Sequence, residues 1–586
     1  MSSSKEDATK EGKALKKSTD IRINSSTISN GKKNNPKESS SKRKNRITML
    51  ALLLIGIIVG MSFGFLLTGF LINLNANNPP VIHSPLVSEI TMKEADAYSF
   101  HISASDPENN PLTYSWFVNG THVGQNQNSY THYSGVDASG VLSVKVIVTD
   151  GRYTAEFTWK VTIGDREVRL FKNINPSGSS TPKYFTVVGD YLFFAASNGV
   201  NGTELWVTDG TESGTRMVKD INPGSSNSMP SELIAVDDKV FFRASNGVNG
   251  SELWVSDGTE AGTYMVEDIF SGSSPGLPEQ LIRVGHTLYF RAKNQSSNVE
   301  LWRSDGTQEG TYMVADIDPS GTSSIDYLTD VNGILYFHAE NGTGDVELYR
   351  SDGTKAGTYL VKDLRSGGSS NPVDLINVND ILYFRATNES DNYELWRSDG
   401  TAVGTYMVKD INPSGNPFIS WLTDLNGVLV FRATDDIHGY ELWRSDGTEA
   451  GTYMVKDINT TTSSNPESFG VVGNYLYFRA NDGTHGNELW RSDGTEAGTF
   501  MIKDINPTGD GNPGSYTLLN NIVVFAAKND SSNIEFWKTE GTEDSTSILA
   551  DINPSGGSSA SGFTNFKNTI FFQATDGIHE EELWIY

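Results

Sequence analysis

The chain has 586 residues, 37% of them hydrophobic, and a formal net charge of −27. It is long enough for several folded domains and too apolar for a wholly disordered protein. It contains no cysteine, which excludes disulfide bonds, a thiol nucleophile and a zinc site held by cysteine. The charge is unevenly divided: residues 1–46 hold 13 Lys and Arg against 5 Asp and Glu, and the rest holds 32 against 67.

The first segment predicts a location at the cell membrane. Residues 1–46 lack apolar periodicity and aromatic residues, so we expect a disordered basic cytoplasmic tail that binds no nucleic acid. Residues 47–74 carry no charge and are long enough to cross a bilayer as a helix. The basic run before them predicts a single-pass signal-anchor, with the C-terminal ectodomain outside the cell. A cleaved signal peptide is the alternative, but its apolar core would be shorter.

Glycines in this predicted transmembrane helix suggest a partner helix. Gly56, Gly60 and Gly64 are spaced four residues apart and would lie on one helix face. Small residues at this spacing allow close approach of a second helix, which predicts a homodimer. The alternative is that glycine is simply common in membrane helices.

Residues 75–167, including the flanking linkers, form the next predicted unit. Apolar residues alternate over short segments around Trp116, and turn residues separate them, as in a β-sandwich. The stretch ASDPENNPLTYSWFVNGT, followed by VKVIVTDG, resembles the PKD and cadherin-like Ig-fold modules. In cadherin-like modules acidic loops can hold calcium, and the matching oxygen-bearing residues here are Asp106, Glu108, Asn110 and Asp150. The alternative is that these residues only form turns.

Residues 168–586 consist of an internal repeat. The triplet ELW or a close variant begins at intervals of 48, 48 and then six times 47 residues. Each copy carries signals for four short antiparallel strands, with a two-residue hairpin connection that is Asn-Gly in two copies and a DGT turn that is intact in most. A four-stranded unit of this length is typical of a β-propeller blade. The nine triplets begin at Glu204, Glu252, Glu300, Glu347, Glu394, Glu441, Glu488, Glu535 and Glu582.

The two ends of the repeat region predict a closed ring. Residues 168–174 read as a fourth strand without its preceding ELW, and residues 582–586 as a third strand with nothing after it. Together they would complete one blade and remove exposed sheet edges. The predicted fold is therefore all-β: one transmembrane helix, an Ig-like sandwich, then a large closed propeller of about nine blades. Two smaller rings or an incomplete ring are the alternatives.

The repeated motif resembles the ELWxxDGT-repeat family, which is also described as hyalin-repeat-like. DGT is intact in seven copies, whereas the eighth reads EFWKTEGTEDST and the fourth has Tyr349 in place of Trp. The resemblance implies large secreted or surface propellers and no assigned reaction.

No catalytic constellation stands out among the titratable residues. Acids that recur nine times around a ring are expected to have structural roles, because a catalytic pair is needed only once. His438, His485 and His579 share the position before ELW, so they fall in separate blades and are not expected to bind one zinc ion. We therefore predict no catalytic residue and a protein that is not an enzyme.

Glycosylation sequons gather in the loops before ELW. An exposed, glycan-tolerant rim is the interpretation, and chance in an Asn-rich chain is the alternative. The candidates at this position are Asn201, Asn249, Asn294, Asn341, Asn388 and Asn529, and Asn119 and Asn459 lie elsewhere.

The loops between blades are expected to carry the binding function. They vary from copy to copy, and variable loops on a rigid scaffold often bind ligands. Phe418, Trp421 and Tyr516 are the aromatic candidates, unless they fill the core between blades. The predicted function is recognition or adhesion at the cell surface toward a protein or glycan, and calcium is the one candidate cofactor. A carbohydrate-active enzyme and a structural envelope component are the alternatives.

Overall fold

The computed structural model describes residues 77–85, 87–93, 96–134, 139–529 and 533–586. Every regular element in these ranges is a β-strand, from β1 (Val81–Ser84) to β45 (Glu582–Ile585). The all-β fold class is confirmed.

The structure corrects the predicted localisation. No helix in the described part of the chain is both long and apolar enough to cross a membrane. The predicted tail (1–46) and signal-anchor (47–74, with its three glycines) lie outside the described residues. The prediction of an ectodomain held at the cell membrane by a single span is corrected by this finding.

The unit before the repeats contains three small sheets around one aromatic core. Trp116, predicted at its centre, is 1% exposed and stacks on Trp159 with 5.7 Å between ring centroids. Phe100 contacts the edge of Trp159 at 5.1 Å. The sheets are β2-β9-β8-β5-β6, β3-β7 and β1-β4, with β2 (Glu89–Lys93), β3 (Ala97–His101), β4 (Ser103–Ser105), β5 (Thr113–Val118), β6 (Thr121–Gln125), β7 (Ser129–Tyr133), β8 (Gly140–Thr149) and β9 (Thr154–Gly164).

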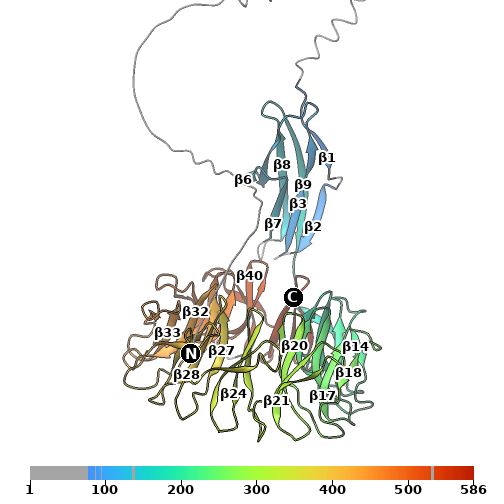
Figure 1. The fold of residues 1–586 in the computed structure, drawn as a ribbon. Coiled ribbons are helices and arrows are strands. Elements are labelled where there is room, and N and C mark those ends of the chain that lie inside the picture. Colours follow the sequence, from blue (N-terminus) through green and yellow to red (C-terminus); the bar gives the residue numbers. More distant parts are fainter. Residues whose placement is uncertain (1–76, 86, 94–95, 135–138, 530–532) are drawn as a thin grey trace, which may run out of the picture. The chain divides into compact units, whose positions relative to one another are not determined.

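Nine four-stranded antiparallel sheets follow in the described residues, one for each repeat, and they are numbered here in chain order (Figure 1). The first strands are β11 (Lys183–Val188), β15 (Ser231–Val236), β19 (Glu279–Val284), β23 (Asp326–Val331), β27 (Val373–Val378), β31 (Ser420–Leu425), β35 (Glu467–Val472), β39 (Gly514–Leu519) and β43 (Ser561–Phe566). The second strands are β12 (Tyr191–Ser197), β16 (Lys239–Ser245), β20 (Thr287–Lys293), β24 (Ile334–Glu340), β28 (Ile381–Thr387), β32 (Val428–Thr434), β36 (Tyr475–Asn481), β40 (Ile522–Lys528) and β44 (Thr569–Ala574).

The third strands carry the ELW triplets. They are β13 (Thr203–Thr208), β17 (Ser251–Ser256), β21 (Val299–Ser304), β25 (Val346–Ser351), β29 (Tyr393–Ser398), β33 (Tyr440–Ser445), β37 (Asn487–Ser492), β41 (Ile534–Thr539) and β45. The fourth strands of the first eight sheets are β14 (Arg216–Lys219), β18 (Tyr264–Glu267), β22 (Tyr312–Ala315), β26 (Tyr359–Lys362), β30 (Tyr406–Lys409), β34 (Tyr453–Lys456), β38 (Phe500–Lys503) and β42 (Ser547–Ala550).

The ninth sheet combines the two ends of the repeat region. Its order is β10-β45-β44-β43, so β10 (Arg169–Lys172) supplies the fourth strand, as the sequence predicts. Leu170 on β10 lies opposite Trp584 on β45. Each first strand contacts the first strand of the next sheet, and β43 contacts β11.

The cores lie between consecutive sheets. In the cluster between the fifth and sixth sheets, Leu395 and Val408 of one sheet meet Leu429 and Phe431 of the next. Phe431 is fully buried, and burying a side chain of this size contributes about 1.5–3 kcal/mol. Strands that are buried on both faces explain why the repeat lacks a polar/apolar alternation.

The acids of the ELW triplets join neighbouring sheets. Glu441 on β33 is 0% exposed and accepts hydrogen bonds from the backbone N of Ile458 (2.9 Å) and of Ser464 (2.8 Å). Both donors belong to the connection that leads to the seventh sheet. Arg432, on the neighbouring strand β32, does not pair with Glu441, because its guanidinium binds Glu467 (2.6 Å). The structural role predicted for these acids is confirmed by these contacts.

The DGT turn is also held by its own side chains. Asp446 Oδ1 accepts hydrogen bonds from the backbone N (2.9 Å) and the hydroxyl (2.7 Å) of Thr448. The Thr448 hydroxyl in turn accepts one from the backbone N of Gly451 (3.0 Å). These bonds fix the turn from β33 to β34, and they lower the pKa of Asp446 because they favour its ionised form.

Candidate functional site

Two residues in the left-handed region, three positions apart, flank the start of each first strand. In the sixth sheet they are Phe418 (φ 47°) and Trp421 (φ 59°). The pairing of β31 with β32 shifts between Ser420 and Thr423, as in a β-bulge. A bulky residue with positive φ is strained, and such strain persists only where the surrounding structure enforces it. The nine-fold recurrence shows that the bulge belongs to the repeat itself.

The side chains at these two positions differ from sheet to sheet although the backbone recurs. The first set, called here the entry positions, is Thr181, Met229, Leu277, Ser324, Asn371, Phe418, Asn465, Asn512 and Ser559. The second set, the bulge positions, is Tyr184, Glu232, Gln280, Tyr327, Asp374, Trp421, Ser468, Ser515 and Gly562. A constant backbone with variable side chains is the arrangement in which binding specificity usually lies.

Two of the three predicted aromatic binding residues lie in these sets and are accessible. Phe418 is 53% exposed and meets Tyr440 edge-on at 6.1 Å, and Trp421 is 43% exposed and lies 6.0 Å from Phe469. Both therefore present part of an aromatic surface to solvent.

Tyr516 differs from the prediction. Its ring packs between Tyr477 (6.1 Å) and Phe525 (6.0 Å), and a side chain at Gly470 would collide with it. Its hydroxyl is buried without a hydrogen-bond partner in the structure. Burial raises the pKa of Tyr516. Its phenol fills the space between the seventh and eighth sheets, which is the alternative that the sequence analysis left open.

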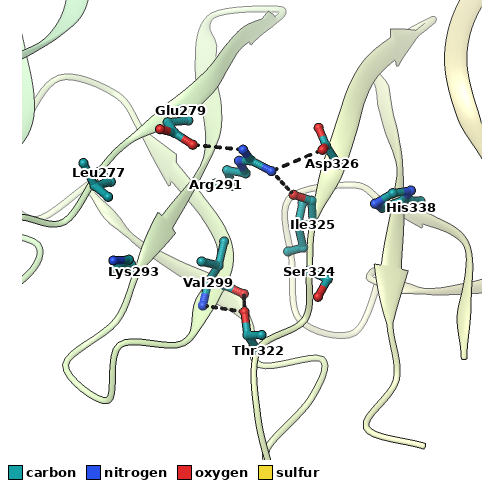
Figure 2. Close-up of a pocket in the computed structure, with 10 residues that line it drawn as sticks. All are labelled: Leu277, Glu279, Arg291, Lys293, Val299, Thr322, Ser324, Ile325, Asp326 and His338. Carbon is teal, nitrogen blue, oxygen red and sulfur yellow. Dashed lines mark hydrogen bonds and ion pairs between the residues drawn. The ribbon is translucent and has the colours of Figure 1, made fainter. Parts of the chain in front are cut away.

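Arginines of the second strands and carboxylates of the first strands form ion pairs within and between several sheets. This series of ion pairs is called here the arginine–carboxylate belt. Glu279 binds Arg291 of its own sheet (2.9 Å) and Arg243 of the preceding sheet (2.8 Å). Figure 2 shows Arg291 reaching from Glu279 to Asp326 of the next sheet, at 3.3 Å. Burial acts to raise the pKa of Glu279, but the hydrogen bonds from the two arginines outweigh it and the pKa is lowered. These ions are therefore compensated by one another.

A cavity of about 430 Å³ lies beside this belt, between the third and fourth sheets (Figure 2). Lys293, Val299 and Thr322 line one part of it, and His338 lies on the far side. Nδ1 of His338 lies 2.9 Å from the carbonyl oxygen of Pro372, and burial lowers the pKa of this histidine. His338 is therefore a neutral ring held in place rather than a cation offered to a ligand.

A second cavity, of about 760 Å³, lies where the first strands of the eighth, ninth and first sheets meet. It is called here the seam cavity. The sheets around it depart from the repeat in two ways. The second strands of these sheets carry no arginine, and the bulge position of the ninth sheet is Gly562. Its lining residues are Pro182, Lys183, Tyr184, Phe185, Ser515, Tyr516, Thr517, Ser561, Gly562, Phe563, Thr564 and Gln573. Sequence reasoning missed this site, although aligning the copies would have revealed three consecutive repeats without the arginine.

The predicted calcium ligands form local turns. Asp106 Oδ1 accepts hydrogen bonds from the backbone N of Glu108 (2.9 Å) and of Asn110 (2.8 Å). Asp150 Oδ1 does the same for the backbone N of Arg152 and of Tyr153, both at 2.6 Å. Among the described residues, no group of three or more His, Asp or Glu side chains is placed to hold a metal ion. Calcium binding stays a prediction.

The three repeated histidines are each paired with an aspartate of their own loop. Nδ1 of His438 lies 2.9 Å from Asp435, and Nδ1 of His485 lies 2.8 Å from Asp482. His579 and Asp576 form the same pair at 2.9 Å. The hydrogen bond to the carboxylate raises the pKa of His438 and of His485. Separate pairs in separate sheets agree with the expectation that these residues do not form one zinc site.

The sequon asparagines have different surroundings. The side-chain amides of Asn201 and Asn249 each donate a hydrogen bond of 2.9 Å to a nearby aspartate. Asn459 is 4% exposed and does not lie on an exposed rim, because its side chain holds the turn that follows it. The remaining candidates are half-buried or exposed, namely Asn119, Asn294, Asn341, Asn388 and Asn529. Glycosylation stays a prediction.

Comparison with known proteins adds only distant structural neighbours. No protein-family model and no curated protein matches the sequence. A solved puromycin hydrolase is 12% identical with a TM-score of 0.33, over 61% of this chain and 61% of that one. The β-propeller domain of the Trilobed protease from Pyrococcus furiosus is 11% identical (TM-score 0.32; 63% and 97% covered). The uncharacterized protein lmo1340 from Listeria monocytogenes is 12% identical (TM-score 0.35; 67% and 100% covered).

These neighbours correct one prediction. The chain spans about three fifths of the length of the puromycin hydrolases that it matches. Several of the solved structures are peptidases or hydrolases, contrary to the prediction that the chain is not an enzyme. That prediction is corrected, and at this similarity no reaction is transferred to the chain.

Proposed function

We propose that the chain is a recognition protein whose closed, nine-bladed β-propeller binds a protein or glycan ligand. The pairing of β10 with β45 and the contact between β43 and β11 support closure of the ring. The ELWxxDGT motif supports membership of that repeat family. The aromatic core around Trp116 supports an Ig-like module before the ring.

The observation that carries the proposal is the pair of left-handed positions in each sheet. The inter-blade connections lead into the first strands at the entry positions, so these residues lie on the same side as the variable loops. On the opposite side, the DGT tripeptide recurs in seven of the eight turns between third and fourth strands, and these turns offer little specificity. A ligand that contacts several sheets on the variable side meets a different side chain at each.

The binding surface can be tested by exchanging side chains between sheets. The probe is a glycan array applied to the full chain, with the double variant Phe418→Asn and Trp421→Ser. These are the residues that the seventh sheet carries at the same positions, Asn465 and Ser468. Because the seventh sheet already holds them with positive φ, the backbone should accept them. We expect array binding to fall at least tenfold while the thermal midpoint of unfolding stays unchanged.

A matched control lies on the opposite side. Glu449→Gln changes an exposed residue of a DGT turn and should leave binding intact. Equal binding by the double variant and the wild type would contradict the proposed surface, and no binding to any glycan would contradict a glycan ligand. Progressive loss of glycan from the array would instead identify a carbohydrate-active enzyme.

A further inference from the structure

The seam cavity is where the charge pattern of the ring changes. In five sheets the second strand carries an arginine that binds a carboxylate or hydroxyl of a first strand: Arg243, Arg291, Arg385, Arg432 and Arg479. In the eighth, ninth and first sheets the residue at this place is Ala526, Gln573 and Ala195. The fourth sheet has His338, but it stands alone between arginine-bearing sheets. Only at the seam is the guanidinium missing from consecutive sheets.

Among the described residues that line the seam cavity, Lys183 is the one cation, and it is uncompensated. Lys183 lies opposite Ala195, at the first-strand position that Glu279 and Glu467 occupy in the belt. Those two glutamates each bind two arginines. Within the described residues the ammonium group of Lys183 has neither an ion pair nor a hydrogen bond, and its side chain is exposed. In a chain with a net charge of −27, an unpaired cation beside a cavity is a selective position for an anion.

The cavity beside Lys183 is walled by aromatic rings. Tyr184, at a bulge position, is 53% exposed, and Phe185 follows it. Gly562 has φ 71° and no side chain, and a Cβ at this position would lie 3.2 Å from the Phe185 ring. In the neighbouring sheets this place is filled by Ser515 and Tyr184, so glycine leaves the room between them open. A volume of about 760 Å³ is within the range of small-molecule sites.

Hydroxyl and amide groups complete the lining. Ser515, Ser561, Thr564 and Gln573 border the cavity, and Gln573 is 7% exposed. Aromatic faces suit the C–H faces of a ring, hydroxyl and amide groups suit its hydroxyl groups, and a lysine suits a carboxylate. An acidic sugar carries all three features in one ring.

We infer that the seam cavity binds a hexuronic acid, the acidic sugar unit of a glycan ligand. The carboxylate would pair with the ammonium of Lys183, and the sugar ring would pack on Tyr184 and Phe185. The inference rests on the proposed function, because it names the chemistry of the ligand and one of the places where it binds.

Titration calorimetry of the full chain tests the assignment with three probes. Glucuronate carries both the ring hydroxyls and the carboxylate, glucose lacks the carboxylate, and cyclohexanecarboxylate lacks the hydroxyls. We expect glucuronate to bind at least tenfold more tightly than either of the others, and its affinity to fall as salt is raised. Equal binding of glucose would show that Lys183 does not select the ligand, and equal binding of cyclohexanecarboxylate would show that the site does not recognise a sugar.

Variants then locate the binding. Lys183→Gln should weaken glucuronate binding at least tenfold, and Lys183→Arg should restore most of it. Lys355→Gln, which removes an exposed lysine from a DGT turn, is the matched control. Gly562→Asn should abolish binding, because asparagine tolerates positive φ and its side chain would enter the cavity. Ser468→Asn, at the bulge position of the seventh sheet, is its control.

The outcomes separate this inference from the proposed function. Unchanged glucuronate binding by folded Lys183→Gln, or no glucuronate binding by the wild type, would overturn the seam assignment. If the array signal still depended on Phe418 and Trp421, the proposed function would stand while the seam assignment failed. If both signals were absent, both would fail.

Discussion

The hydroxyl of Ser464 donates a 2.5 Å hydrogen bond to the buried carboxylate of Glu441, 23 residues earlier in the chain. The same two places are occupied by Glu394 and Pro417 one repeat before. Proline offers neither a hydroxyl nor a backbone N–H, and Oε1 of Glu394 is buried without a partner. The pKa of Glu394 is raised to about 8 by burial, against about 7 for Glu441, which keeps the bonds from Ser464.

Replacing this proline should stabilise the fold. Pro417→Ser would supply the donors that Glu394 lacks, and an unsatisfied buried polar atom costs about 1–3 kcal/mol. Replacing proline by serine raises the conformational entropy of the unfolded chain, and this offsets part of the gain in stability. We expect the free energy of unfolding to rise by about 1 kcal/mol in denaturant titrations. Ser464→Ala is the reciprocal variant and should lower it; a gain from both substitutions would contradict the role assigned to these bonds.

The buried glutamates also predict how stability depends on pH. The pKa of six of them is raised to about 7 or 8, chiefly by burial, and that of the other three is raised in the same direction. An unfolded glutamate titrates at about 4.5, so the stabilising contribution of the protonated form is complete below this pH and is lost as pH rises through 7. The raised pKa of His438 and of His485 acts in the same direction.

The expected result is a higher free energy of unfolding at pH 5 than at pH 8. The DGT aspartates act oppositely, since their pKa is lowered, but their contribution is lost only as pH falls below about 4. Denaturant titrations at several pH values measure the slope. Glu441→Gln should make it shallower by up to one proton, about 1.4 kcal/mol per pH unit, between pH 5 and 7. A slope that the substitution leaves unchanged would show that Glu441 is ionised throughout.

Much of this architecture could be predicted because its determinants are local. The two-residue hairpin connections and the DGT turns specify where strands end, and the fixed repeat length specifies which strands share a sheet. The pairing of β10 with β45 followed from counting strands at the two ends. The DGT turn is local in the same sense, because the hydrogen bonds of Asp446 lie within two residues.

The candidate site was less predictable because its determinants are not local. Trp421 has positive φ although its residue type disfavours it, since the bulge is enforced by the strands around it and not by a glycine. Tyr516 was expected on the surface, and its burial depends on Gly470, 46 residues earlier, which leaves room for the ring. The seam cavity depends on three residue changes in different repeats, which no single motif contains.

The DGT turn predicts a position where even alanine is not tolerated. A Cβ on Gly451 would lie 2.0 Å from Oδ1 of Asp446, the oxygen that holds the turn. Gly451→Ala should therefore break the bonds between Asp446 and Thr448 and lower the thermal midpoint of unfolding. Gly178→Ala is the control, since a Cβ there meets nothing nearer than 3.5 Å. Equal midpoints for the two variants would contradict this account of the turn.

Closure of the ring predicts a large effect from a residue at the start of the repeat region. Phe171 on β10 is 5% exposed and meets the ring of Phe571 edge-on at 5.1 Å, although 400 residues separate them. Removing a buried phenylalanine side chain costs about 3–5 kcal/mol. If β10 completes the ninth sheet, Phe171→Ala should therefore lower the free energy of unfolding by an amount in this range.

The same substitution should also increase protease cleavage near the C-terminus, because β45 would lose its outer neighbour. Arg169→Ala, on an exposed position of the same strand, is the matched control and should have little effect. An unchanged unfolding free energy for Phe171→Ala would show that the ring is not held closed by this strand.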